Sequence, residues 1–306
     1  MLHSKTVTGA VTSVGSRDLR SAAKLGDWSL VVAVNDESVL QQTLLASPAV
    51  DSKCQTIVKR SFASAGQAYN SGLREACNNV VVFAHQDVYF PESWTRNLER
   101  AVLQLSEDDP NWGVLGVFGV ATSPLRELAG YCYSTGLCRI LGAPFANPVR
   151  AASLDELTLV IRRSSGLTFD EKLPGFHLYG TDICLQALSR GMRSYIIPAF
   201  CIHNSNGLSY YPAEYWRGYR YMQRKWRQQL PVHTSCVTIT SSSRLMFKQR
   251  IMDSARRLFG PPRVGKRSSD IGTLYRRVMA QTDRLTSQGA PERANSILAD
   301  SKMESN

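Results

Sequence analysis

A histidine and an aspartate stand two residues apart where a short apolar run ends, in the stretch VVVFAHQDVYF (residues 80–90). Residues two apart on an extended chain point to the same side, so His85 and Asp87 are expected to face the same space. Imidazole nitrogen and carboxylate oxygen both bind divalent cations in proteins. The pair therefore predicts a metal site, where an ion would neutralise a diphosphate. The alternative is that Asp87 caps the following turn and His85 only packs.

Strands and helices alternate around this pair. Apolar runs without helical spacing predict strands at 28–34, 55–59, 80–84, 112–120, 157–162 and 194–198; helical spacing predicts helices near 39–47, 68–76, 181–190, 213–230 and 245–259. This order indicates an α/β fold with a mostly parallel central sheet flanked by helices. Ligands of such sheets gather beyond the carboxyl ends of the strands. Asn35, Asp36, His85 and Asp87 are thus expected at one rim.

The order of these segments resembles a family 2 glycosyltransferase with the GT-A fold. The resemblance runs through VVAVND, SAGQAYNSGLREA, the H-Q-D tripeptide at 85–87, LDELTLVIRR and FDEKLPGFHLYGTDICLQALSRGMRSYIIPAFCIHN, and ends in YRYMQRKWRQQLP. Its most specific part is FHLYGTDICLQA followed by a strand and His203. It implies a GT-A-like catalytic domain at 27–231, an N-terminal extension at 1–26 and a basic, partly helical C-terminal extension at 232–306.

The resemblance implies donor-binding roles for several polar residues. Asn35 and Asp36 take the positions that contact the nucleotide base and ribose in the family, although a turn pair after a strand is also a purely structural arrangement. Asn70, near a helix start, would help to hold the nucleotide. Asp155 resembles a position near the donor sugar, and Glu156 replaces the glycine that usually follows it.

The metal and acceptor positions follow from the same resemblance. Asp87 would hold Mn²⁺ or Mg²⁺, and His85 takes the place of the first carboxylate of the family's D-x-D motif. His203 resembles a position where some members supply another metal or diphosphate ligand, although a histidine at a strand end is often only a satisfied polar group. His177 and Tyr179 would line the acceptor pocket, with packing beside Phe176 as the alternative for His177.

Asp182 opens a predicted helix in the sequence Gly-Thr-Asp. The acidic residue that it resembles in the family is the general base, which deprotonates the acceptor hydroxyl so that it attacks the anomeric carbon with inversion. A hydroxyl is a poor nucleophile until a positioned base takes its proton, which fits this role. The alternative is structural, because an acid in the first turn caps a helix and interacts favourably with its dipole.

Charge is unevenly distributed along the chain. Residues 1–210 carry 18 Lys and Arg and 18 Asp and Glu, so the whole net charge of +11 lies in 211–306. Within that part, Tyr215, Tyr219, Met222 and Trp226 form an apolar helical stripe that we expect to pack on the catalytic domain. Residues 245–259 interleave basic and apolar side chains, which suits either a helix lying on an anionic membrane surface or a helix packed on the body.

Composition bounds the remaining possibilities. The seven scattered cysteines form no C-x-x-C pair, which disfavours a zinc knuckle or a disulfide framework and favours a reducing compartment. We expect neither a cleaved signal nor a membrane span, and thus a cytoplasmic protein, at most peripheral at the inner membrane surface. A neutral body argues against nucleic-acid binding.

Together the sequence predicts an enzyme that moves a sugar from a nucleotide-sugar donor to a hydroxyl of a glycan or lipid-linked glycan. The alternative is a non-catalytic module of the same fold that binds nucleotide sugar or glycan. This alternative is suggested by the missing first carboxylate at His85.

Overall fold

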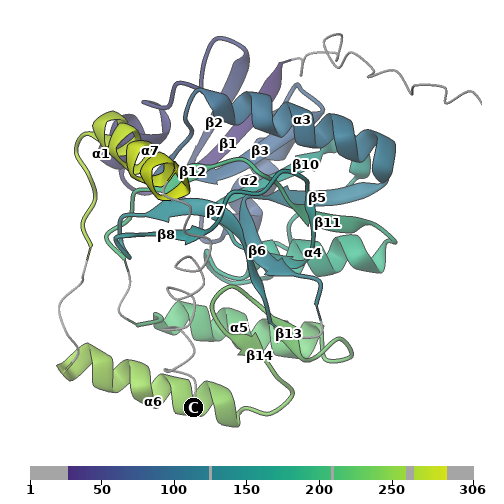
Figure 1. The fold of residues 1–306 in the computed structure, drawn as a ribbon. Helices are drawn as coiled ribbons and strands as arrows, with labels where there is room; N and C mark the ends of the chain where they lie inside the picture. Colours follow the sequence, from purple (N-terminus) through teal and green to yellow (C-terminus); the bar gives the residue numbers. More distant parts are fainter. Residues whose placement is uncertain (1–26, 124–125, 208–209, 260–264, 288–306) are drawn as a thin grey trace, which may run out of the picture.

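The computed structural model describes residues 27–123, 126–207, 210–259 and 265–287 (Figure 1). Its centre is a twelve-stranded sheet in the order β2-β1-β3-β10-β5-β11-β9-β6-β7-β12-β4, with β8 paired to β7. The strands of this sheet are β1 (Trp28–Val34), β2 (Cys54–Arg60), β3 (Val80–His85), β4 (Val88–Tyr89), β5 (Trp112–Gly116), β6 (Phe118–Ala121), β7 (Leu128–Ser134), β8 (Arg139–Gly142), β9 (Val149–Leu154), β10 (Thr158–Arg162), β11 (Arg193–Ile196) and β12 (Cys201–His203).

The helices lie on the faces and edges of this sheet. They are α1 (Glu37–Val39) with a π-helical continuation (Leu40–Leu44), α2 (Ala65–Glu75), α3 (Ser93–Asp108), α4 (Tyr179–Ser189), α5 (Ala213–Lys225), α6 (Arg244–Phe259) and α7 (Ile271–Ser287). A short 3₁₀ turn (Arg163–Ser165) follows β10, and a two-stranded hairpin of β13 (Val232–His233) and β14 (Thr238–Ile239) follows α5. The predicted mixed α/β class is confirmed.

The sheet is parallel in one part and antiparallel in the other. Along the first six strands of the order, β2, β1, β3, β5 and β11 point the same way and only β10 runs against them. Beyond β11, antiparallel pairs dominate through β9, β6, β7 and β4. The sequence predicted a mostly parallel sheet, which describes the first part. The second part comes from hairpins over 118–154 that carry little periodic signal.

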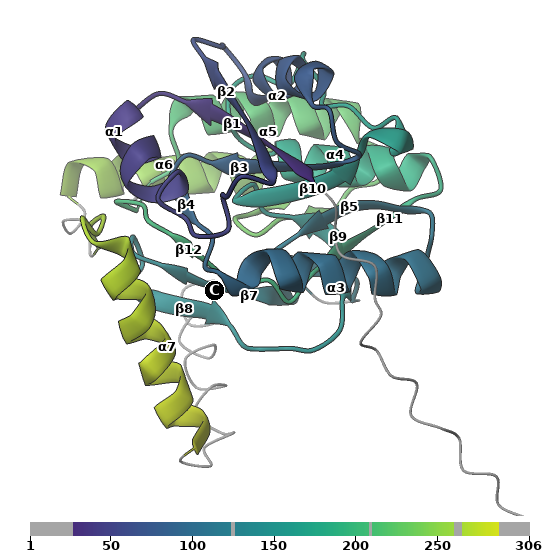
Figure 2. The ribbon, with the colours of Figure 1, turned by 90° about the horizontal axis from the view of Figure 1, so that it is seen from above.

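Alternate residues of the central strands pack into two separate hydrophobic cores, one on each face of the sheet. Val31 and Phe83 face α2, α4 and α5, whereas Leu30, Val32 and Val82 face the π-helical segment Leu40–Leu44 and α3. Figure 2 shows α3 along one side of the sheet, with α2, α4 and α5 on the other. The two-sided burial explains why β1 and β3 are continuous apolar runs rather than alternating ones.

Two sequence predictions differ from the structure in detail. The predicted strand 112–120 is two strands, β5 and β6, which separate at Val117 and pair with different neighbours. Glycines at 113, 116 and 119 let this segment lie close to neighbouring segments of the chain, since a Cβ on Gly119 would lie 2.3 Å from the Ser153 carbonyl oxygen. The helix α7 was not predicted from the sequence.

The described part of 232–287 packs on the rest of the molecule. Val232, Ile239 and Met246 belong to the same core as the α2 face of the sheet. Ile271 and Val278 of α7 pack with Tyr89, Phe200 and Ile202 near the β4 edge. No disulfide occurs among the described residues, and none of their helices has the length and apolarity needed to cross a membrane.

Candidate functional site

Strand pairing brings three chain segments to one end of the sheet. The parallel register Ala33↔His85 puts the residues after β1 beside the end of β3. The antiparallel register Thr158↔Ala84 brings the start of β10 to the same end, and the backbone N–H of His85 donates to the Leu157 carbonyl at 3.2 Å. This is the rim that the sequence predicted, because the carboxyl ends of parallel strands meet at one edge.

His203 reaches this rim from the far end of the strand order. In the antiparallel pair β12–β4, His203 lies opposite Val88, directly after Asp87. As a result, one ligand atom each from His85, Asp87 and His203 lies within 4.8 Å of the others. His203 Nε2 is 3.5 Å from Asp87 Oδ1. Asp87 does not cap α3, which starts at Ser93.

Electrostatics keep the carboxylate of this cluster ionised. Burial disfavours the charge of Asp87, but His203, His85 and Arg267 outweigh it and lower the pKa of Asp87 to about 2. Burial also opposes a charge on His203, yet the charge and hydrogen bond of Asp87 raise its pKa. Burial lowers the pKa of His85, with Asp87 opposing. The site therefore offers one carboxylate and one neutral imidazole to a cation near neutral pH.

Tyr179, the first residue of α4, fixes the ring of His85. Its hydroxyl donates to the Glu156 carbonyl at 3.2 Å and lies 2.9 Å from His85 Nε2. When the single proton of the hydroxyl goes to the Glu156 carbonyl, His85 donates Nε2–H to the hydroxyl, and this tautomer leaves Nδ1 with the free lone pair. Metal-binding histidines are oriented by such a contact to the second nitrogen. Tyr179, expected to line an acceptor pocket, is only 3% exposed and lies behind His85.

The donor set fits a divalent transition ion. Two imidazoles and one carboxylate suit Mn²⁺ and its first-row neighbours, whereas Mg²⁺ prefers oxygen ligands throughout. The ligand atoms of the three side chains lie within 4.8 Å of one another, so the three residues could hold one ion. Of the two ions predicted from the sequence, the donor set favours Mn²⁺.

Asn35 and Asp36 are hydrogen-bonded to Gln86, the middle residue of H-Q-D, which lies between His85 and Asp87. Gln86 Oε1 accepts from the backbone N–H groups of Asn35 and Asp36 at 3.0 and 3.1 Å, and its amide donates to Asn35 Oδ1 at 2.5 Å. Asp36 also caps α1, since Oδ1 accepts from the Val39 N–H at 3.1 Å. The turn role weighed from the sequence is therefore present, and Oδ2 of Asp36 remains directed at Arg267, 4.0 Å away.

Asp155 and His177 lie near the cluster without contacting it. The negative charge of Asp155 acts on the pKa of both His85 and His203. Ser235 donates to its Oδ2 at 2.6 Å and the Leu157 N–H to its Oδ1 at 3.1 Å. The ring of His177 packs on Tyr215 with centroids 5.5 Å apart, and burial lowers its pKa. His177 thus packs on an aromatic ring of α5, and its role in an acceptor pocket stays a prediction.

Asn70 is held in a separate structural contact. Its amide donates to the Phe169 carbonyl at 2.9 Å and to Glu171 Oε1 at 3.0 Å, and its oxygen accepts from the Phe169 N–H at 2.9 Å. The side chain is 7% exposed. Asn70 therefore ties α2 to the 169–171 turn, and its polar atoms are already paired.

Asp182 lies in a buried network of its own. Lys225 Nζ lies 2.7 and 2.9 Å from its two oxygens, Trp226 donates to Oδ1 at 2.7 Å and Gln186 to Oδ2 at 2.8 Å. Burial raises the pKa of Asp182, although Lys225 and Trp226 oppose this. Asp182 does not cap α4, whose cap position is Leu178. Asp182 lies three positions after Tyr179, so the first turn of α4 connects the two networks.

Several residues of these networks were not identified from the sequence. The sequence predicts no role for Gln86, which lies between two predicted ligands, or for Lys225, which lies in the last segment of the resemblance, YRYMQRKWRQQLP. Arg267 belongs to no sequence motif, and only the tertiary packing of its segment places it at the site. Leu178 adopts a left-handed conformation (φ 66°) just before α4, which a leucine rarely does and which sequence patterns do not reveal.

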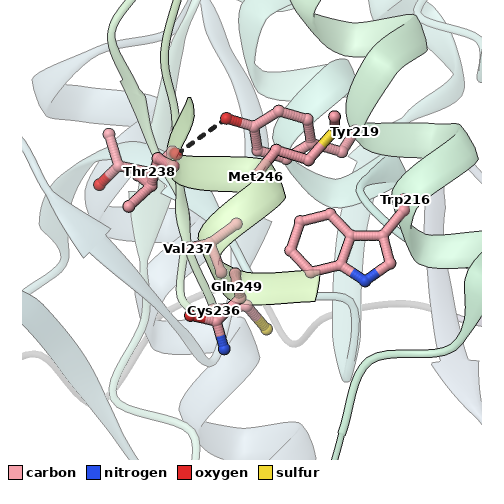
Figure 3. Close-up of a pocket in the computed structure, with 8 residues that line it drawn as sticks. Trp216, Tyr219, Cys236, Val237, Thr238, Met246 and Gln249 are labelled. Carbon is pink, nitrogen blue, oxygen red and sulfur yellow. Dashed lines mark hydrogen bonds between the residues drawn. The ribbon is translucent and has the colours of Figure 1, made fainter. Parts of the chain in front are cut away.

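Two cavities lie elsewhere in the described structure. One, of about 160 Å³, sits between α5, the β13–β14 hairpin and α6 and is lined by Trp216, Cys236 and Met246 among others (Figure 3). The other borders α4 and β9 and includes Cys184 and His233. Neither is lined by a residue of the His85–Asp87–His203 cluster.

Comparisons with known proteins give distant matches. No family model matches the chain. A stretch of 166 residues is 33% identical to "ATP synthase subunits region ORF 6" of Fuscovulum blasticum, covering 52% of this chain and 64% of that protein, so the match spans less than two thirds of the relative. The assignment to family 2 therefore stays a prediction.

Two solved structures are similar at low identity. Mannosyltransferase PcManGT from Pyrobaculum calidifontis, in complex with GDP-Man and Mn²⁺, is 12% identical, with a TM-score of 0.42, over 92% of this chain and 82% of its own. A197 from STIV is 11% identical, with a TM-score of 0.34, over 55% of this chain and 80% of its own.

Proposed function

We propose that the protein is a nucleotide-sugar-dependent glycosyltransferase that transfers one sugar, with inversion, to a hydroxyl of a glycan or lipid-linked glycan. The observation that carries the proposal is the convergence of His85, Asp87 and His203 from separate chain segments. They meet beside the loop of Asn35 and Asp36, which Gln86 ties to the same strand end. A metal-binding cluster next to a polar loop at the carboxyl ends of parallel strands suits a nucleotide diphosphate.

The residues of the site bind and orient the donor. A divalent ion held by the cluster would neutralise the diphosphate and make it a better leaving group. Asp87 is ionised throughout the physiological range because its pKa is about 2. Tyr179 holds His85 in one tautomer. We assign contacts with the nucleotide to Asn35 and Asp36.

We assign the proton acceptor to Asp182. The acceptor oxygen would bond to the anomeric carbon, its proton would pass to Asp182, and the bond to the diphosphate oxygen would break with its electron pair staying on the diphosphate. The raised pKa of Asp182 makes it a stronger base than an exposed aspartate. At 1% exposure, it meets an acceptor only after the Lys225–Trp226 segment opens locally.

The helix α6 supports contact with an anionic membrane, where a lipid-linked acceptor would lie. Phe247, Ile251 and Leu258 are 63%, 56% and 74% exposed and follow one line along the helix. The opposite side holds Met246 and Asp253, which are buried. Exposed basic residues flank the apolar line: Arg244, Lys248 and Arg250. An apolar stripe between cations is the pattern of a helix lying in a membrane interface.

The competing function is a non-catalytic module that binds nucleotide sugar or glycan. The specific observation in its favour is the complete pairing of Asp182, which leaves the proposed base occupied in this conformation. Such a module would bind a nucleoside diphosphate and metal but would not turn over a donor.

A thermal-shift panel separates these outcomes. UDP, GDP and CDP and their sugar derivatives are tested with Mn²⁺, with Mg²⁺ and with a chelator, because a ligand that binds the native state raises its stability by about 2.7 kcal/mol at a hundredfold excess over Kd. We expect a selective shift, larger with Mn²⁺, that Asp87→Ala abolishes and Asp51→Ala, in the turn before β2, leaves intact. Release of free sugar from the donor then distinguishes an enzyme from a binder. Indifference to every nucleotide contradicts both.

A further inference from the structure

Arg267 reaches the metal-binding cluster from the segment between α6 and α7. Its Nη2 lies 3.7 Å from Asp87 Oδ2 and its Nη1 lies 4.0 Å from Asp36 Oδ2. One guanidinium group thus faces both the proposed metal-binding carboxylate and the proposed donor loop. The side chain is one third exposed, so the same group is open to solvent and to ligand.

The position of Arg267 is fixed by hydrogen bonds to the loop after β12. Its backbone N–H donates to Asn206 Oδ1 at 3.1 Å and its Nε donates to the Asn204 carbonyl at 3.2 Å. Next to it, the Ser268 N–H donates to Asn204 Oδ1 at 2.7 Å, and Asn204 Nδ2 donates to the Ser268 carbonyl at 3.0 Å. Asn204 is 1% exposed, and its own N–H donates to the Asp87 carbonyl at 2.7 Å. A buried asparagine therefore links the two segments that carry Arg267 and Asp87.

Packing on both sides holds the segment in place. Gly265 lies against the loop after β7, where a Cβ would come within 1.8 Å of the Thr135 carbonyl oxygen. On the other side, Ile271 opens α7, whose apolar face packs on β4 and β12. Both views of the fold place α7 beside β12 and β8 (Figures 1 and 2). Arg267 is thus held at the site by contacts of its backbone, its Nε and its neighbours, which do not involve Nη1 or Nη2.

The charges and free N–H groups around the cluster favour the binding of an anion. Both guanidinium–carboxylate distances exceed direct hydrogen-bonding range, so Nη1 and Nη2 keep N–H groups for another acceptor. Once His203 gives up its proton on binding, a divalent cation held by one carboxylate and two imidazoles retains a net positive charge, and Arg267 adds to it. The planar guanidinium fork matches the oxygens of a phosphate group better than a point charge does.

We propose that Arg267 binds the diphosphate of the donor, together with the metal held by His85, Asp87 and His203. This assignment rests on the proposed function, and it makes the segment 265–270 part of the donor site. The competing explanation is that Arg267 is only a counter-ion for Asp36 and Asp87. In that case removal of Arg267 leaves the two carboxylates without this counter-ion. Cation binding then becomes stronger, and the binding of anions is not weakened.

The test measures binding rather than turnover, with wild type, Arg267→Gln and Arg267→Lys. Mn²⁺ binding alone is followed by electron paramagnetic resonance, and binding of UDP, GDP and inorganic pyrophosphate in the presence of Mn²⁺ by calorimetry. We expect Arg267→Gln to weaken binding of the best diphosphate by about tenfold or more, with Mn²⁺ binding unchanged or tighter. Arg267→Lys should retain part of the affinity. If Arg267→Gln loses affinity for pyrophosphate by the same factor as for the nucleoside diphosphate, Arg267 contacts the phosphates.

Arg277→Gln, an exposed arginine on α7, is the matched control and should bind like wild type. If wild type binds Mn²⁺ and a nucleoside diphosphate, and Arg267→Gln binds the diphosphate as well or better, the role of Arg267 is wrong while the proposed function stands. Loss of Mn²⁺ and diphosphate together in Arg267→Gln also overturns it, because the residue then only maintains the fold of the site. If wild type binds no diphosphate, the proposed function fails with it.

Discussion

The hydroxyl of Tyr179 lies 2.9 Å from Nε2 of His85, so the first residue of α4 orients a residue at the end of β3. The same hydroxyl donates to the carbonyl of Glu156, two residues before β10. One buried group thus connects three elements around the cluster. It also joins the proposed metal site to the helix that carries Asp182.

Tyr179→Phe should therefore weaken metal binding while the ring packing is kept. Without the hydroxyl, the His85 ring loses the partner that selects its tautomer, and loss of such a partner costs about tenfold or more in metal affinity. The measurement is a Mn²⁺ titration followed by electron paramagnetic resonance. Tyr69→Phe is the matched control, since the Tyr69 hydroxyl is 3.4 Å from that of Tyr179 and does not reach His85. Equal losses in both variants would contradict the positioning role.

Asp182→Asn should lower sugar transfer by about a hundredfold or more, because an amide cannot accept the acceptor proton. Binding of Mn²⁺ and donor should be unchanged. Asp170→Asn is the control, as Asp170 also pairs with Lys225, at 2.6 Å, but is not the proposed base. It should be less stable than wild type by about 1 kcal/mol and keep its transfer rate within a few fold. If both variants lose activity equally, Asp182 has only a structural role.

Glu156→Gln should make stability less sensitive to pH. Burial and the charge of Asp155 raise the pKa of Glu156 to about 8, although the N–H groups of Leu178 and Gly180 oppose this. The raised pKa means that the folded state keeps a proton that the unfolded state loses above its value of 4.5, so the contribution of Glu156 is present at pH 4.5 and is lost as pH rises toward 8.

The measurement is urea unfolding of both proteins between pH 5 and pH 8. The free energy of unfolding of the variant should rise relative to that of wild type as pH rises, by about 3.5 kcal/mol over the range. Asn111→Ala, which removes no titrating group, should show a difference from wild type that does not change with pH. Parallel curves for Glu156→Gln and wild type would show that the carboxyl is already ionised in the folded state at pH 5.

The double variant Phe247→Ser with Ile251→Ser should lose affinity for anionic vesicles by about tenfold or more, because each side chain contributes apolar burial in the interface. Cosedimentation with phosphatidylcholine vesicles, with and without phosphatidylglycerol, measures the effect. Added salt should weaken binding of the wild type, since the flanking cations are exposed. Leu188→Ser on α4, where Leu188 is 55% exposed, is the control. If the wild-type protein cosediments with neither type of vesicle, α6 is not a membrane contact.

Local patterns in the sequence were enough for the parallel half of the fold. The runs at β1, β3 and β10 are apolar at successive positions along their centres because both sheet faces are covered, and the helices α2, α4 and α5 show their buried stripes directly. Since parallel strands end at one rim, the placement of Asn35, Asp36, His85 and Asp87 followed from these patterns. The hairpins of 118–154 could not be predicted from local patterns, because the register of short antiparallel strands depends on the strands with which they pair.

The chain's own residue order determined that His85 and Asp87 share one side of a strand end and that the basic charge lies after residue 210. Only the tertiary structure decided what surrounds them. His203 joins the cluster because β12 pairs with β4 across 115 residues, Asp182 is paired because α5 packs on α4, and Arg267 arrives because α7 packs on the sheet edge. Contacts between residues far apart in sequence carry no local signal, since they are set by how whole elements bury their apolar faces.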